Sequence, residues 1–169
     1  STRPILGWVC CASVLRLEGS ETRPPVSFLA GAPGEEDYLL EKFWDHVGQV
    51  PRSATWVTFN GKDFDIPFLQ MRSLANGVEP AETGLNNTYP YGHEPHADLM
   101  KVWAGQHYTL DQLCSHLGIE SPKQDVAGED VARLVKEDNL EAVAEYCEGD
   151  ARATLRCWQA MRPLLHILN

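Results

Sequence analysis

The chain has 169 residues, 43% of them hydrophobic and 22% charged, so it is long enough to bury a core and has a globular composition. Its formal net charge of −10 excludes a protein that holds nucleic acid through a broadly basic surface, although an acidic pocket filled with divalent cations still attracts phosphate. We expect no membrane association, because no apolar run approaches the ~18 residues of a membrane span. The first residues do not resemble a secretory signal.

The cysteines indicate a reducing environment. Their number is odd, and none belongs to a C-x-x-C pair, so we expect neither a zinc site nor a disulfide framework. We therefore expect a cytoplasmic protein whose thiols are small, buried apolar side chains. The cysteines are Cys10, Cys11, Cys114, Cys147 and Cys157.

The first third of the chain predicts a hairpin and a helix. Residues 7–17 form an apolar run rich in Val and Cys, which predicts a buried strand. A turn at residues 19–25 separates it from a second strand at residues 26–30. Residues 35–47 predict a helix, since apolar residues recur at helical spacing after an acidic first turn.

The middle of the chain predicts a strand at residues 54–60, rich in β-branched and aromatic residues. Pro67 then opens a helix, which Asn76 and Gly77 close. Residues 79–95 contain several turn-forming residues and predict a loop, and residues 96–103 predict a short strand.

The last third predicts three helices. One spans residues 109–119 with Thr109 as its N-cap, a short one lies within residues 128–138, and a long one spans residues 139–165. This order of strands and helices indicates one α/β domain with a mixed sheet over residues 1–169. The stripe that we expect the long helix to bury consists of Leu140, Ala144, Cys147, Ala151, Leu155 and Trp158.

Three polar residues are candidates for chemistry. Tyr146 and Asp150 are four residues apart, so they share one face of the long helix. Asp65 stands at a helix start, where a carboxylate also interacts favourably with the helix dipole. Each residue also has an ordinary structural interpretation. Asp150 could be a surface acid near a half-buried Tyr146, and Asp65 could be a helix-terminal acid.

Two segments together resemble a nuclease family. "FNGKDFDIPFL" (residues 59–69) and "YCEGD" (residues 146–150) resemble the second and third motifs of the DEDDy 3'-5' exonucleases. The nearest match is the predicted exonucleases related to the proofreading domain of family B DNA polymerases. The resemblance extends to "HADLMKVW" and "TLDQLCSHLGIESPK". It implies a ribonuclease H-like fold, a mixed β-sheet flanked by helices.

The resemblance also implies a site that uses Mg²⁺ or Mn²⁺, two ions in the intact family, both of which prefer carboxylate ligands. Asp65 and Asp150 would be metal ligands and catalytic residues, and Tyr146 would orient the attacking water. The implied function is a 3'-5' exonuclease that acts on single-stranded ends, with DNA favoured over RNA, and releases nucleoside monophosphates.

Other positions would bind the nucleic acid. Asn60 and Phe64 would contact the terminal nucleotides by hydrogen bonding and stacking. Lys123 would lie near the scissile phosphate; the alternative interpretation is an ordinary solvated lysine. His96 and Asp98 border the site or serve a structural role.

One part of the family pattern is not found in this chain. The first motif, D-x-E on a central first strand, is absent, and the chain begins with what resembles the second strand. We expect the domain to be truncated at its N-terminus; a strand from another chain or loss of the site are the alternatives. The alternative function is a catalytically impaired ribonuclease H-like module that binds nucleic-acid ends or a protein.

Overall fold

A computed structural model describes residues 3–103, 107–121, 128 and 130–165. Strand β1 (Cys11–Val14) pairs antiparallel with β4 (Val26–Leu29), with Cys11 opposite Leu29. The tip of this hairpin is a second antiparallel pair, β2 (Leu17–Glu18) with β3 (Glu21–Thr22). The predicted hairpin is therefore confirmed; β3 lies inside the segment expected to be a turn, and β2 directly precedes that segment.

A separate parallel pair joins β5 (Trp56–Thr58) and β6 (His96–Asp98). Within the described ranges, no strand pairs β1 with β5, so the strands form short two-stranded sheets. The sequence predicted a sheet that lacks its central strand, and the separation of the β1–β4 and β5–β6 pairs agrees with that prediction.

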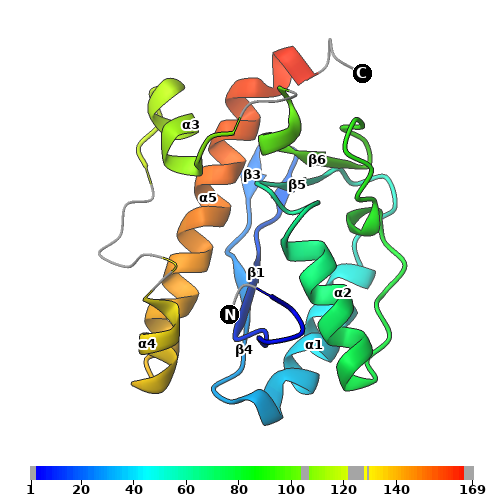
Figure 1. Ribbon diagram of the computed structural model, residues 1–169. Coiled ribbons are helices and arrows are strands. Elements are labelled where there is room, and N and C mark those ends of the chain that lie inside the picture. The colour runs from blue at the N-terminus through cyan, green and yellow to red at the C-terminus, as the bar shows by residue number, and fades with distance from the viewer. Residues whose placement is uncertain (1–2, 104–106, 122–127, 129, 166–169) are drawn as a thin grey trace.

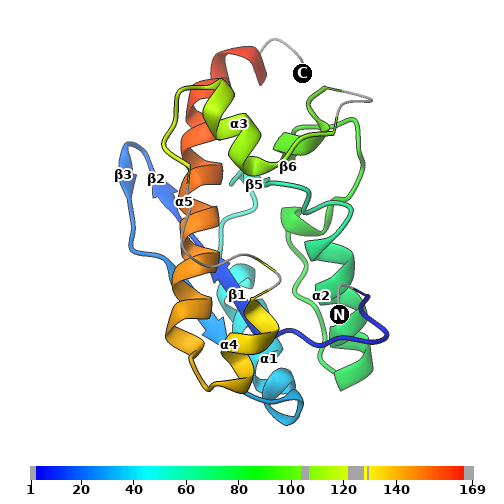
Figure 2. The ribbon, with the colours of Figure 1, turned by 60° about the vertical axis from the view of Figure 1, so that its left-hand side comes forward.

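The helices flank the strands on two sides (Figure 1). The long helix α5 contacts β1, β4 and β5, while α1 contacts β4 and α2. Figure 2 shows α3 and α4 beside opposite ends of α5, and each of them contacts it. The α-helices are α1 (Glu36–Gly48), α2 (Asp65–Asn76), α3 (Leu110–His116), α4 (Val131–Lys136) and α5 (Leu140–Leu165). Short 3₁₀ helices are η1 (Pro33–Glu35), η2 (Gly84–Asn86) and η3 (Leu99–Lys101).

The core has two parts, one on each side of the strands. Leu39, Leu40 and Phe43 of α1 pack with Ile66 and Leu69 of α2 in the first. The second lies under α3 and α5, and includes Leu99, Leu113, Cys114, Cys157 and Met161. This mixed α/β architecture confirms the predicted fold class and is consistent with a ribonuclease H-like exonuclease domain. Among the described residues, no helix has the length and apolarity needed to cross a membrane.

Two burial predictions were wrong. Every residue of β1 is half-buried, although the apolar run predicted a buried strand; β1 has one paired neighbour, so part of its surface stays open. The six residues expected to form the buried stripe of α5 are all half-buried. The residues that α5 buries are Val143, Ala153, Thr154, Cys157, Met161 and Leu165. The buried face of α5 is therefore rotated relative to the prediction, and Ala153, Cys157, Met161 and Leu165 pack in one cluster with Leu113 and Cys114 of α3.

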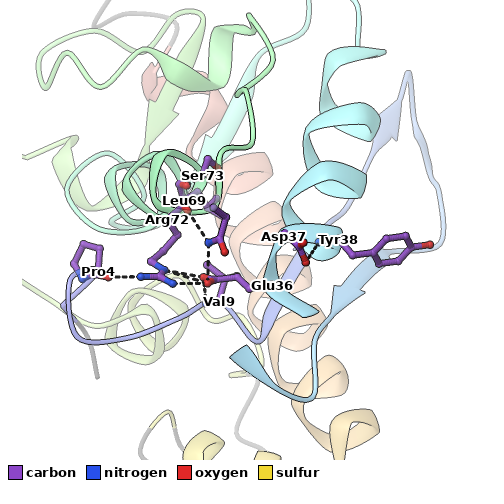
Figure 3. A network of polar contacts seen from close by, with 9 residues as sticks. Pro4, Val9, Glu36, Asp37, Tyr38, Leu69, Arg72 and Ser73 are labelled. Atoms are coloured by element: carbon purple, nitrogen blue, oxygen red, sulfur yellow. Dashed lines mark hydrogen bonds and ion pairs between the residues drawn. The ribbon is translucent and has the colours of Figure 1, made fainter. Parts of the chain in front are cut away.

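A buried ionic network joins the elements around α1 (Figure 3). The carboxylate of Glu36 is fully buried and accepts hydrogen bonds from Val9 N at 2.7 Å, Arg72 Nη2 at 2.5 Å and Asn76 Nδ2 at 3.0 Å. Arg72 also donates to the carbonyl oxygen of Pro4. Burial acts to raise the pKa of Glu36, but these hydrogen bonds outweigh it and hold the pKa below its ordinary value. The network thus fixes α2 and the segment before β1 against α1.

Candidate active site

A tight turn delivers the motif residues from β5 to α2. Asn60 adopts a left-handed conformation with φ of 62°, a conformation that asparagine tolerates better than most residues. A Cβ atom on Gly61 would lie 2.5 Å from the side chain of Thr58, so this position requires glycine. The buried carboxylate of Asp98 accepts hydrogen bonds from Asn60 N at 2.7 Å and Lys62 N at 3.0 Å. Asp98, at the end of β6, therefore holds the turn in place.

Asp65 follows this turn as the first residue of α2. Asp65 as a whole residue is exposed to solvent, but its carboxyl group is surrounded by protein atoms and is therefore largely buried. That burial raises the pKa of Asp65 to about 6; its own backbone N–H opposes the rise, and the negative charges of Asp98 and Asp150 add to it. The influence of Asp150 means that two acids distant in the chain lie in the same electrostatic environment.

Tyr146 and Asp150 lie on α5, one helical turn apart and both half-buried. The Tyr146 hydroxyl and the Asp150 carboxylate interact, and each shifts the pKa of the other. Burial raises the pKa of Tyr146 to about 12, and the neighbouring Asp150 charge contributes, so the phenol keeps its proton at neutral pH. Burial also raises the pKa of Asp150, and the charge of Asp111 on α3 adds to the effect, whereas the interaction with Tyr146 opposes it.

The site is therefore a region of mutually repelling acids with one phenol. Carboxylate oxygen is the ligand type that hard divalent cations prefer. A bound cation would offset both the burial and the repulsion that raise the pKa of Asp65. Asp65 and Asp150 fit such an ion on these grounds. Across the described part of the chain, however, no group of three or more His, Cys, Asp or Glu side chains is arranged to hold a metal ion. Two carboxylates alone would leave most coordination positions to water.

The structure places the predicted nucleic-acid contacts as follows. Phe64 is the N-cap residue of α2; its ring is 39% exposed and lies 5.8 Å from that of Phe68. Asn60 is half-buried in the turn. Lys123 lies outside the described residues. His96 is fully buried and bonds Thr58 Oγ1 at 2.8 Å and the Asn87 carbonyl at 3.0 Å, a structural role.

Sequence reasoning named one supporting residue without its contacts and missed two others. Asp98 was expected to border the site or serve a structural role, and it locks the turn before Asp65. Lys62 was not singled out, although it is 3% exposed and its ammonium binds two carbonyls of the loop before β6. Asp111 acts on both Tyr146 and Asp150 from α3. Only the Asp98 position carried a sequence signal, an acid at the end of a predicted strand.

Comparison with known proteins identifies the family. Residues 5–166 match the family described as predicted 3'-5' exonucleases related to the exonuclease domain of PolB. This chain belongs to that family. The match confirms the resemblance found in the sequence and supports a nuclease role in general terms.

Similar proteins include two DNA polymerases and an uncharacterized protein. The chain is 33% identical over 148 residues to DNA polymerase 1 of Aeropyrum pernix, covering 79% of this chain and 15% of the polymerase. It is 28% identical over 137 residues to DNA polymerase 1 of Sulfurisphaera ohwakuensis, covering 72% of this chain and 15% of that polymerase. It is also 29% identical over 138 residues to the uncharacterized protein MJ0365 of Methanocaldococcus jannaschii, covering 77% and 74% of the two chains. The chain thus spans a small part of the polymerases and most of MJ0365.

Proposed function

We propose that this chain is the core of a metal-dependent 3'-5' exonuclease that shortens single-stranded ends, DNA in preference to RNA, and releases nucleoside monophosphates. The observations that support the proposal are the effect of the Asp150 charge on Asp65 and the interaction of Asp150 with the hydroxyl of Tyr146. Family membership supports a nuclease role, and the DNA polymerases among the relatives favour DNA. Five free cysteines fit a reducing, cytoplasmic location.

The chemistry assigned to this chain's residues is simple. Asp65 and Asp150 would hold a divalent cation, Mg²⁺ or Mn²⁺, which when bound neutralises phosphate charge and lowers the pKa of water. Tyr146 keeps its proton at neutral pH and would orient the attacking water through its hydroxyl. The water oxygen forms a bond to phosphorus while the bond from phosphorus to the 3'-oxygen breaks, and that oxygen takes up a proton.

The substrate contacts in the proposal surround the turn before α2. Phe64 would stack on a terminal base, for which its partly exposed ring at the helix start is suitably placed. Asn60 would hydrogen-bond the same end of the strand. Lys123 would approach the scissile phosphate from its loop.

The proposal includes a strand that this chain does not supply. Strands β1 and β5 have one partner each among the described strands, and the D-x-E motif of the family is not found in the sequence. We propose that a strand bearing those two carboxylates pairs between β1 and β5, from a longer form of the polypeptide or from another chain. The absence of a three-ligand group in the described residues also favours a second candidate, a module that binds nucleic-acid ends without cleaving them.

The test combines metal binding with cleavage. The chain of 169 residues, the same chain with an added D-x-E strand and the Asp150→Asn form of each are titrated with Mn²⁺ and followed by electron paramagnetic resonance. Each protein is also incubated with a 5'-labelled single strand. We expect tight Mn²⁺ binding and stepwise 3' shortening only in the extended form with Asp150 intact. Strand binding without shortening in every form would favour the binding module, and equal shortening with Asp150→Asn would refute the metal assignment.

A further inference from the structure

A pair of tyrosines stands in the loop before β6. Tyr89 is 62% exposed and Tyr91 is 76% exposed, and their ring centroids are 5.7 Å apart in an edge-to-face arrangement. Large exposed aromatic rings do not stabilise a fold by burial, so a paired set on a rigid loop is unexpected for a purely structural segment.

The loop is fixed from below by a buried lysine. Lys62 Nζ donates hydrogen bonds of 2.6 Å to the carbonyl oxygens of both Tyr89 and Gly92. Burial lowers the pKa of Lys62, and the charge of Asp98 opposes this effect. At the other end of the loop, Asn87 Oδ1 accepts from Tyr89 N at 3.0 Å, and the Asn87 carbonyl bonds His96. These contacts hold the backbone that presents the two rings.

The same contacts link the tyrosine pair to the candidate active site. Lys62 belongs to the turn that Asp98 locks, and Asp65 follows three residues later at the start of α2. The position of the tyrosine backbone relative to Asp65 is therefore set by one short, hydrogen-bonded path. The exposed residue Phe64 stands at the start of the same helix.

We propose that Tyr89 and Tyr91 form a stacking platform for bases of the single-stranded substrate, upstream of the nucleotide at Asp65. This inference rests on the proposed function. Stacking on aromatic rings binds single strands with little sequence preference, because every base offers an aromatic face. It supplies affinity that does not depend on charge, which suits a chain whose net charge of −10 makes general phosphate attraction weak.

The test is a fluorescence anisotropy titration of a labelled single strand, with Ca²⁺ in place of Mn²⁺ to prevent cleavage. Stacking on one ring contributes roughly fivefold to a hundredfold in affinity, so the double variant Tyr89→Ala/Tyr91→Ala should bind at least tenfold more weakly. The Tyr89→Phe/Tyr91→Phe variant keeps the rings and should bind within twofold of the wild type. Tyr38→Ala removes an equally exposed ring, 62%, from α1 and is the matched control.

Abasic substitutions then locate the contact. A strand lacking the bases that reach the pair should bind the wild type and the double-alanine variant equally. Wild-type affinity in the double-alanine variant, with cleavage intact, would overturn the platform and leave the nuclease function standing. If the wild-type sequence extended by a D-x-E strand neither binds nor shortens single strands, both the platform and the nuclease function are overturned. All the changes lie on exposed side chains, and unchanged thermal unfolding would confirm that the fold is kept.

Discussion

The buried carboxylate of Glu36 gives a stability prediction that can be worked out from its contacts. In Glu36→Gln the side chain keeps its shape, but one end becomes an NH₂ donor. Oε1 accepts from Val9 N and Arg72 Nε, while Oε2 accepts from Arg72 Nη2 and Asn76 Nδ2. Whichever end of the glutamine carries the NH₂ group, at least two of the surrounding N–H donors then face another donor instead of an acceptor. The negative charge opposite Arg72 is also lost.

Each hydrogen bond to a charged group contributes about 1.5–3 kcal/mol. The Arg72 side chain is 19% exposed, so hydration of its guanidinium group recovers part of the loss. We therefore expect Glu36→Gln to lower the free energy of unfolding by about 3 kcal/mol. For a domain of this size, that corresponds to a fall in Tm of about 6–12 °C. Guanidinium unfolding and calorimetry at neutral pH measure both quantities.

The pH dependence supplies a sharper check. The folded-state pKa of Glu36 is below its ordinary value of 4.5, so its contribution is fully present above that value and is lost as pH falls through the folded pKa. The wild-type and Glu36→Gln unfolding curves should therefore converge in acid. Glu82→Gln, in the exposed ion pair with Arg52, is the control and should change little. A loss for Glu36→Gln below about 1 kcal/mol, or one independent of pH, would refute the reasoning.

Three further predictions concern the turn and the acids beside it. Gly61→Ala forces a Cβ against the side chain of the preceding strand and should cost about 1–3 kcal/mol in denaturant unfolding, whereas Gly34→Ala enters open space and should cost far less. Asp98→Asn weakens the acceptor for two turn amides and should cost about 2 kcal/mol; retained stability and retained cleavage by the extended form would contradict its role. The carboxyl carbon of Asp65 should titrate near pH 6 by NMR, so its ionisation lowers stability as pH rises from about 4 to 6. Its midpoint should fall in Asp150→Asn, and a midpoint near 3.8 in the wild type would contradict the predicted crowding.

The sequence predicted local structure well where the chain carries explicit end signals. Thr109 forms the expected cap, with its hydroxyl on Gln112 N and the Gln112 side chain returning to Thr109 N. Gly77 ends α2 in the left-handed conformation, with φ of 69°. These signals act within one helical turn, so they can be identified without knowledge of the tertiary packing.

Features that depend on distant partners could not be predicted in this way. The acidic first turn of α1 was expected to suit the helix dipole, and nothing in the sequence indicated that Glu36 is fully buried, because Arg72 and Asn76 of α2 reach it. The buried face of α5 includes Cys157 and Met161, which pack with Leu113 and Cys114 of α3, an element that lies earlier in the chain. For the candidate site, motif resemblance identified Asp65, Tyr146 and Asp150, and their roles stay predictions.

The contacts of Asp98 give a reason for a second acid whose charge acts on Asp65. The two carboxylate oxygens of Asp98 accept from the amides of Asn60 and Lys62, and a carboxylate in this position also places negative charge beside Asp65. The same group therefore orders the turn and raises the pKa of Asp65. A neutral acceptor would order the turn with less repulsion, but it would also make the site less attractive to a cation. The repulsion between Asp98 and Asp65 is expected at a site whose negative charge a divalent ion would neutralise.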